Sequence, residues 1–419
     1  MPTWVQASLF TRMNCNNKGG TVMKLVRIIL IHFATLLVVL NSKSVFYGIL
    51  HSSESKGVLL IVVLALFAMQ CIVRKRYAIK KDVLITISML LFLLLASDLY
   101  NGTGFNGVSV FLACFVIAIL YSQVISKDEF MCSYINVMVV IAVISLICSA
   151  IKIASPGITN IFLSQRYQLE DSYYIASPLY TWGTFYIDPR NYGPFWEPGA
   201  FQIYLNIAIL FLIATNTMLK KGKFIILVVA LLTTMSTTGY IIAAIMVLFF
   251  YDDILAIVVS RKKRTINPKT KYITFLIIVF LILGWVLTSE VVVNKFSVSN
   301  VSYNTRVNDI IQSLELSVKN IFFGLGNTDT LKNEIQSRNI QTNSNGLLAM
   351  IYTFGGFYAF FYMYRIKKGI NYLFCKNTKL QNNVIFIIFI IMFSTEAVYW
   401  FQFFCVLLLT YDMREKRLE

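Results

Sequence analysis

Long runs of apolar residues, separated by polar and basic segments, dominate the pattern of this 419-residue chain. Many have roughly the 17 to 25 residues that an α-helix needs to cross the hydrocarbon core of a bilayer. The runs lack strict apolar–polar alternation, which favours helices over the strands of a membrane barrel. Spans are therefore predicted at 24–41, 57–73, 83–98, 107–122, 133–153, 197–218, 224–237, 239–259, 272–288, 345–364, 382–395 and 396–411.

Two apolar segments are too long for one span and carry polar residues near the middle. Segment 224–259 is interrupted by Ser236-Thr237-Thr238-Gly239, and segment 382–411 by Ser394-Thr395-Glu396. Each is either two short helices or one long bent helix. The fold class predicted is all-α, a polytopic membrane protein with about twelve spans, or about ten as the lower alternative.

Lysine and arginine gather in loops between alternate spans, and such loops face the cytoplasm under the positive-inside rule. With twelve spans, all of these loops fall on one side together with both chain ends. The predicted organisation is a cytoplasmic tail over 1–23, a single transmembrane domain over 24–411 and a cytoplasmic tail over 412–419, with Met23 as an alternative start. The basic segments are 74–81, 220–223, 261–271, 365–379 and 414–417.

The amino-acid composition agrees with a membrane protein and favours lipid over nucleic acid as a binding partner. Hydrophobic residues form 57% of the chain and charged residues 14%, more apolar surface than a water-soluble domain of this length buries. The net charge of +17 follows from the basic loops, which also meet anionic lipid. No nucleic-acid-binding motif accompanies this charge. We expect the lipid bilayer as a partner and no nucleic acid.

The cysteines and histidines point to neither a disulfide framework nor a metal. None of the seven cysteines falls in a predicted outward loop, and no spacing suits a metal ion. His32 and His51 lie in the first span and the first outward loop, distant in sequence from the candidate site below. No cofactor is expected.

Two predicted outward loops are long, 154–196 and 289–344, and function in such proteins concentrates in long non-helical segments. The first ends in Pro-Arg-Asn-Tyr-Gly-Pro-Phe-Trp-Glu-Pro-Gly (189–199). Arg190 there is either a side chain that reaches to the headgroups or a planar fork for a phosphate. Glu197 is a partner of Arg190, a cap of the helix that starts at Pro198, or a group that activates or binds an acceptor.

Aromatic residues crowd the same loop. They form either an interfacial belt or a set of flat faces for sugar rings. Those nearest Arg190, namely Tyr186, Tyr192 and Trp196, are the candidates for substrate binding. The group also includes Tyr167, Tyr173, Tyr174, Tyr180, Trp182 and Phe185, and Arg166 lies in the same loop.

The second loop and the last apolar segment add further polar candidates. Arg306 precedes the stretch 307–319, whose apolar spacing predicts an amphipathic helix along the membrane surface. Ser344 and Asn345 open the next span, either as ordinary caps or as ligands of a phosphate or sugar hydroxyl. Glu396, inside an apolar segment, is expected to face the protein interior or a water-filled cavity.

These pieces, in this order, resemble the O-antigen ligase and polymerase superfamily of bacterial envelope glycosyltransferases. The resemblance covers about half the chain, from 190 to 400, and its motifs are short. It rests on Arg190 with Gly193, Phe195 and Glu197-Pro198-Gly199, on Ser236-Thr237-Thr238-Gly239-Tyr240, on Arg306 with Phe323-Gly324-Leu325-Gly326, and on Ser344-Asn345-Gly346-Leu347 before Gly355-Gly356.

The resemblance implies a GT-C-like helical fold, an extracytoplasmic site and a polyprenyl-diphosphate-linked oligosaccharide donor. Arg190 and Arg306 take the role of the arginines that hold the diphosphate, and Tyr240 joins the substrate-binding candidates. The ligases carry a histidine, thought to be the base, where this chain has Ser344-Asn345. Its absence favours a polymerase, leaves Glu197 as the candidate base with Glu396 behind it, and suggests a chain-length regulator and a flippase as partners.

The expected activity is polymerisation of lipid-linked repeat units at the bacterial cytoplasmic membrane, for O-antigen, capsule or exopolysaccharide. Three alternatives remain open. They are an O-antigen ligase, a flippase or other transporter of lipid-linked glycans, and a non-catalytic assembly subunit. Transporters of that kind usually carry matched halves with broken helices, and the two halves of this chain do not match.

Overall fold

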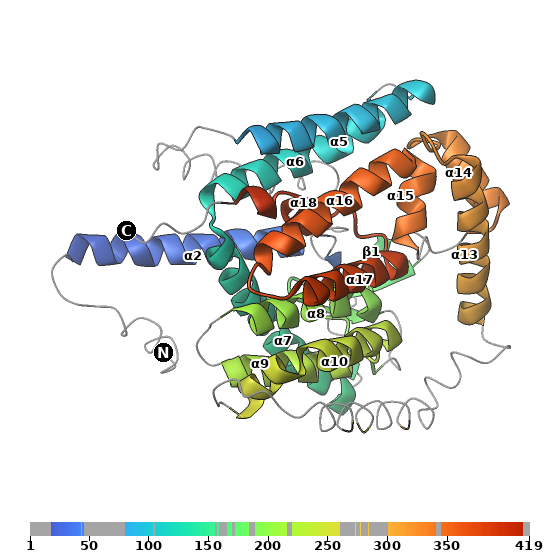
Figure 1. The fold of residues 1–419 in the computed structure, drawn as a ribbon. Coiled ribbons are helices and arrows are strands. Elements are labelled where there is room, and N and C mark those ends of the chain that lie inside the picture. The colour runs from blue at the N-terminus through green and yellow to red at the C-terminus, as the bar shows by residue number, and fades with distance from the viewer. Residues whose placement is uncertain are drawn as a thin grey trace.

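The structure is a computed structural model that describes residues 18–42, 44–45, 80–103, 105–155, 157–158, 166–169, 172–183, 189–215, 220–259, 301–340 and 345–413, with single positions 273, 277 and 284. This part of the chain is mostly helical (Figure 1). Its helices are α2 (Lys18–Leu40), α5 (Lys81–Tyr100), α6 (Asn106–Val124), α7 (Lys127–Ala154), α8 (Pro198–Ala214), α9 (Lys220–Thr233), α10 (Thr237–Val259), α13 (Val301–Lys319), α14 (Asp329–Ser337), α15 (Gly346–Phe354), α16 (Gly356–Leu373), α17 (Lys379–Thr395), α18 (Gln402–Leu408) and the short η3 (Thr410–Asp412).

Among the described residues, three helices are long and apolar enough to cross a membrane, judged by length and composition: α5, α7 and α10. Four shorter apolar stretches accompany them, at Leu25–Leu40, Phe111–Val124, Pro198–Ala214 and Lys379–Thr395. The predicted class, a helical membrane protein, agrees with these helices at that level, and the count of twelve spans stays a prediction. Apart from the three single positions, predicted spans 57–73 and 272–288 lie outside the described residues.

Helix α8 forms the centre of the bundle. All of its residues from Ala200 to Ile213 are buried, against α7, α9 and α10. A helix that is apolar all round is typical of this central position. Helix α8 carries two buried side-chain amides, those of Gln202 and Asn206. They form one hydrogen bond with each other, in which Asn206 Nδ2 donates to Gln202 Oε1 at 2.8 Å.

Both overlong apolar segments are two helices rather than one bent helix. α9 and α10 are separated at residues 234–236, where Met235 takes a φ of 49°. α17 ends at Thr395, and the non-helical residues 396–401 lead into α18. Polar residues placed in the middle of an apolar run therefore marked both breaks correctly.

The predicted continuous helix over 345–364 is wrong, because the chain breaks at Gly355 into α15 and α16. Gly355 has a φ of 90°, and the carbonyl carbon of Phe322 would lie 2.7 Å from a Cβ there. The turn 321–326 fills the break. Leu325 N donates to Tyr352 O and Gly326 N to Thr353 O, both at 2.8 Å, so the carbonyls at the end of α15 are satisfied.

We expect Gly355→Ala to destabilise the chain. A positive φ strains any residue with a Cβ by about 1–3 kcal/mol, and the clash with the Phe322 carbonyl adds to that. Thermal unfolding of the purified chain in detergent measures the loss. Gly222→Ala in the first turn of α9 is the control, since a Cβ there meets nothing within 4 Å. Equal melting temperatures for the two variants would contradict this account of the break.

The first long loop contains a small antiparallel sheet, which the all-α prediction lacks. Strands β1 (Arg166–Leu169), β2 (Ser172–Ser177) and β3 (Tyr180–Gly183) pair in the order β1-β2-β3. Tyr180 and Trp182 are buried and lie edge to face, with ring centroids 4.9 Å apart, beside Cys148 of α7. Alternation of aromatic and small residues along these short strands is a β pattern, and the buried rings pack the sheet onto the bundle.

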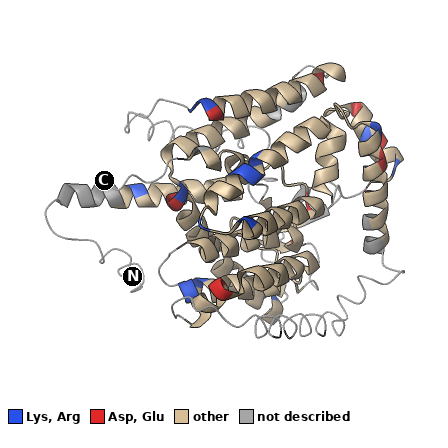
Figure 2. Cartoon of the chain, in the orientation of Figure 1, with Lys and Arg blue, Asp and Glu red and all other residues tan. Residues whose placement is uncertain are grey.

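The helices run side by side and give the bundle two distinct ends (Figure 1). Helices α5, α7, α9 and α17 all begin with lysine at one end, which we call the basic end; α8 and α16 finish there. Figure 2 shows basic residues on helix ends at the left of the bundle, several of them with acidic residues beside them, and a further group of acidic and basic residues on α13 and α14 at the right. The opposite end, where α17 stops at Glu396, we call the Glu396 end.

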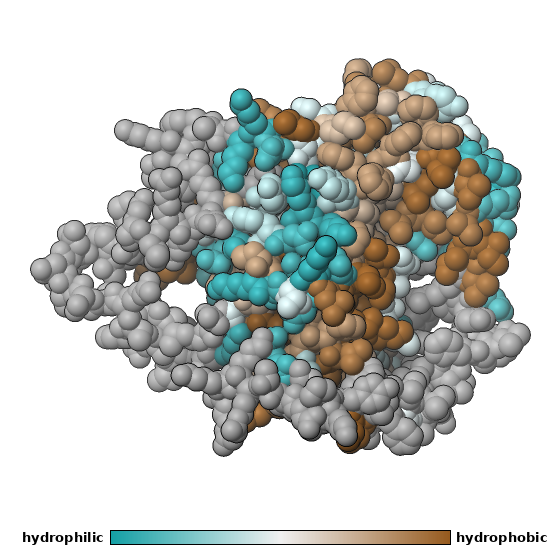
Figure 3. Space-filling model, in the orientation of Figure 1, coloured by the Kyte–Doolittle hydropathy of each residue, from teal (hydrophilic) through white to brown (hydrophobic). Residues whose placement is uncertain are grey.

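Helix α13 lies crosswise to the bundle at the Glu396 end (Figure 1) and has three faces. Asp309, Ser313 and Ser317 are buried on the face toward α15. Figure 3 shows an apolar patch over α13, whose exposed apolar residues are Val307, Ile310, Ile311, Leu314 and Val318. The amphipathic helix predicted from the sequence is present, and its buried side is polar apart from Leu316.

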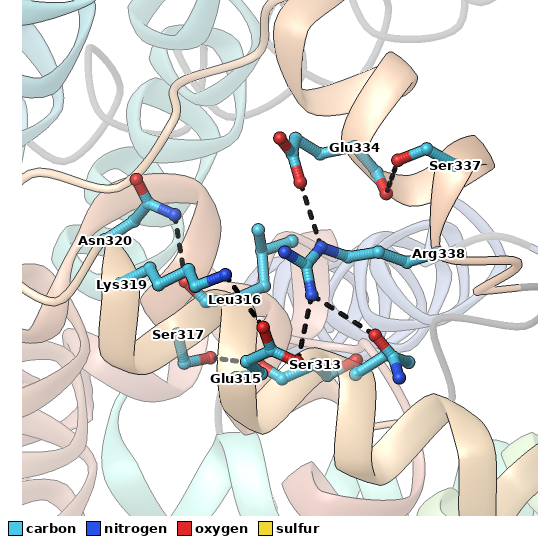
Figure 4. Close-up of polar contacts among 10 residues, drawn as sticks. Ser313, Glu315, Leu316, Ser317, Lys319, Asn320, Glu334, Ser337 and Arg338 are labelled. Atoms are coloured by element: carbon cyan, nitrogen blue, oxygen red, sulfur yellow. Dashed lines mark hydrogen bonds and ion pairs between the residues drawn. The ribbon is translucent and has the colours of Figure 1, made fainter.

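The third face of α13 carries an ion-pair cluster with α14 (Figure 4). Arg338 Nε donates to Glu334 at 2.9 Å, and Arg338 Nη1 lies 3.3 Å from Glu315. Hydrogen bonds from Lys319 and Arg338 hold the pKa of Glu315 below its ordinary value. This water-exposed cluster ties α14 to the outer side of α13.

Candidate functional site

The backbone of the polar segment 189–197 is hydrogen-bonded to three other parts of the chain. Asn191 N donates to Thr233 O of α9 at 2.9 Å, and Thr181 N of β3 donates to Gly193 O at 2.7 Å. Val45 N, beyond the end of α2, donates to Pro194 O at 2.9 Å. These bonds fix the backbone immediately before α8, so Arg190 and Glu197 project from a rigid support.

Asn191 is the anchor of this segment, and sequence reasoning missed it. Its buried side chain donates to Ser145 Oγ and Thr233 Oγ1, each at 3.0 Å, and accepts from Gly193 N at 2.9 Å. The amide thus links α7, α9 and the loop. Its position beside Arg190 is the one sequence signal that pointed to it.

Two cationic side chains lie against one tyrosine. The guanidinium carbon of the half-buried Arg190 is 5.8 Å from the centre of the Tyr192 ring, and its Nη2 is 3.5 Å from the Tyr192 hydroxyl. Lys152, near the end of α7, places its Nζ 5.3 Å from the same ring centre. Tyr192 thereby brings a guanidinium and an ammonium group to the same region, with cation–π attraction holding both.

Lys152 was not predicted as a site residue. It falls near the end of an apolar run, where a lysine reads as a side chain that extends to the headgroups. In the structure Lys152 is only 3% exposed, and its Nζ lies 3.7 Å from where a Cβ on Gly183 would stand. A Cβ there would only touch the ammonium group, so glycine is favoured at this position by its φ of 89° and not by lack of space.

Glu197 occupies the N-cap position of α8, and Pro198 is the first helical residue as predicted. Its carboxylate makes no capping hydrogen bond, and no ion pair joins it to Arg190. Instead Glu197 Oε1 accepts from Trp196 Nε1 at 3.2 Å. Glu197 is therefore neither an ion-pair partner of Arg190 nor a side-chain cap of α8. One of its carboxylate oxygens remains to interact with an acceptor.

Glu396 ties the starts of two helices together. A Cβ on Gly199, in the first turn of α8, would lie 2.7 Å from Glu396 Oε1 and 3.6 Å from the carboxylate carbon of Glu197. A Cβ on Gly346, at the start of α15, would lie 2.6 Å from Ala397 Cα. Glu396 is 8% exposed, and its carboxylate is stabilised by the positive end of α8. Glu197 and Glu396 thus converge on one helix start.

The other predicted binding residues have structural partners. Tyr240 is buried and donates from its hydroxyl to Leu232 O at 2.6 Å, at the end of α9. Asn345 caps α15, with its Oδ1 accepting from Leu348 N at 3.1 Å. Trp196 is half-buried and meets Phe401 edge to face at 5.5 Å. All three lie at the Glu396 end, beside the breaks that the sequence marked.

Three predicted site residues are not placed. Tyr186 and Ser344 lie outside the described residues, as does the side chain of Arg306. The backbone of Arg306 is in α13, the crosswise helix that packs on α15. Within the described ranges no group of three or more His, Cys, Asp and Glu side chains could hold a metal ion.

No protein-family model matches the chain, and neither a curated protein nor a solved structure matches it. The half-buried guanidinium of Arg190, backed by the buried charge of Lys152, can hold a phosphate group, and a carboxylate with one free oxygen can take a proton from a hydroxyl.

Proposed function

We propose that this chain is a polysaccharide polymerase that joins polyprenyl-diphosphate-linked oligosaccharide repeat units. The observation that carries the proposal is the meeting of Arg190 and Lys152 on Tyr192, on the segment that leads to the carboxylates Glu197 and Glu396. A donor with an anionic leaving group needs cationic side chains, and an acceptor hydroxyl needs a carboxylate to take its proton. The resemblance of the Arg190 and Arg306 motifs to envelope glycosyltransferases points to the same reaction.

The site is assigned to the outer face of the bacterial cytoplasmic membrane. The helix ends rich in lysine lie at the basic end, and the positive-inside rule orients that end, with both chain termini, to the cytoplasm. The Glu396 end then faces outward. Lipid-linked repeat units delivered there by a flippase would reach the site from the bilayer, and a chain-length regulator would act on the growing polymer.

The reaction transfers one glycan onto another without a metal. Arg190, with Arg306 from α13, holds the diphosphate of the donor, and the buried Lys152 adds its positive charge from behind Tyr192. A hydroxyl of the acceptor glycan attacks the anomeric carbon from the opposite face and forms the new glycosidic bond with inversion. The bond from that carbon to the phosphate oxygen breaks, its electron pair leaves with the polyprenyl diphosphate, and Glu197 takes the hydroxyl proton. The cations stabilise the charge that develops on the leaving group.

A ligase and a transporter are the competing functions. The ligase would use the same donor and a lipid A core acceptor, and the chain lacks a histidine in its second half to serve as the base. The transporter would move the donor across the bilayer and make no bond. Deletion of the gene separates these outcomes. The polymerase predicts cells with single repeat units in place of polymer, and cells that lack even the single unit on their surface would refute it.

We expect Gly199→Ala to reduce polymerisation by at least about tenfold while the chain still folds. The new Cβ would displace the carboxylate of Glu396, which can rotate away, and a displacement of about 1 Å near a reacting centre is costly. Polymer formed by membranes at matched protein levels gives the readout, with Gly222→Ala as the control. Full activity in Gly199→Ala would remove Glu396 from the site.

A further inference from the structure

A polar cavity lies at the basic end, the end of the bundle opposite to Arg190. The start of α7, the end of α8 and the end of α16 enclose about 270 Å³, partly open to the surface. None of its lining residues belongs to the site described above. The polar residues that line it are Lys127, Asp128, Thr215, Cys375, Lys376 and Asn377.

The cavity is equipped to bind an anion. Lys127 is held in place, with its Nζ 3.4 Å from Cys375 Sγ and 4.8 Å from the centre of the Tyr372 ring. Asn377 Nδ2 is buried from solvent and has no hydrogen-bond partner within the described part of the chain. Lys376 adds a second ammonium group. A buried amide donor without a partner is costly, and a rotation of the Asn377 side chain toward the cavity lets an anion accept from it and remove the cost.

The charge of the lining selects the kind of anion. Lys127 and Lys376 contribute two positive charges and Asp128 one negative charge, which leaves one net positive charge. A phosphodiester carries a single negative charge, whereas a phosphate monoester carries about 1.5 to 2 at neutral pH. The balance therefore favours a phosphodiester.

The remaining lining and the position favour a lipid as its source. Met131, Ala214, Leu373 and Phe374 give the cavity apolar walls that suit a glycerol and the first methylenes of acyl chains. The cavity opens where apolar helices end, the level at which headgroups lie, and basic pockets between helix ends bind anionic headgroups. We propose that this cavity binds the headgroup of an anionic phospholipid, with the phosphodiester held by Lys127, Lys376 and Asn377.

Titration of the full chain in neutral detergent with phosphatidylglycerol tests the proposal. We expect one saturable site, weakened about tenfold by Lys127→Met and again by Lys376→Met, because each removes a charge-assisted hydrogen bond. Phosphatidylcholine and inorganic phosphate should fail to compete. Asp128→Asn should tighten binding, since it raises the net positive charge of the lining.

The matched control is Lys221→Met with Lys379→Met, which removes two exposed lysines from the same end outside the cavity. It should bind like the wild type. Lys127→Arg with Lys376→Arg keeps the charges, so its retained binding separates lost contacts from lost folding. Equal losses in the cavity and control variants would overturn the site. Competition by inorganic phosphate would assign the cavity to free phosphate, and the absence of saturable binding would end the proposal.

Discussion

Arg190→Ala loses at least about 10²-fold of the polymerising activity if the leaving diphosphate is held as proposed. A preorganised donor aimed at charge that develops in the transition state contributes about that much. Arg306→Ala should lose a similar factor, and Lys152→Met about tenfold or more. Polymer length and amount in membranes, at matched protein levels, are the measurement.

The control for these variants is Lys332→Ala, which removes an exposed cation of α14 at the same end. It should keep full activity, because its contact within the described part of the chain is an ion pair with Asp329 at the water-exposed surface. Lys152→Arg keeps the charge against Tyr192 and should recover part of the loss. Full activity in both Arg190→Ala and Arg306→Ala would refute the mechanism.

Glu197→Gln is expected to lose about 10²- to 10⁴-fold, the range that a positioned general base contributes. The amide keeps the shape of the side chain and the contact with Trp196, but it cannot take a proton. Single-turnover rates with donor at saturating concentration measure the loss. Binding of the donor should stay close to that of the wild type.

Glu396→Gln separates the roles of the two carboxylates. Glu396 lies behind Glu197 against the first turn of α8, so its neutral variant should lose less. The reverse order, with Glu396→Gln the more damaged variant, would move the role of base to Glu396. Wild-type activity in both Glu197→Gln and Glu396→Gln would leave the reaction without a carboxylate base.

The apolar pattern predicted the helices well where a polar or proline residue marks their limits. Pro198 begins α8, Thr395 ends α17 before Glu396, and residues 234–236 separate α9 from α10. The break at Gly355 escaped prediction because apolar residues continue on both sides. Its positive φ is imposed by the turn around Phe322, which lies some thirty residues earlier in the chain.

The sequence predicted individual residues of the site, but it did not predict how they are placed relative to one another. The Arg190 segment, Glu197 and Glu396 stood out as polar residues at the ends of apolar runs. That Glu396 meets Gly199 depends on long-range packing, which no local pattern records. The role of Lys152 could not be predicted for the same reason, because its burial follows from the contact of α7 with β3 and Tyr192.

Reconstitution of the purified chain in lipid vesicles with a polyprenyl-diphosphate-linked oligosaccharide tests the central claim most directly. The account predicts a ladder of products that differ by one repeat unit, with one polyprenyl diphosphate released for each unit added. Donor that crosses the bilayer with no new glycosidic bond, or donor that remains single at full protein load, would contradict it.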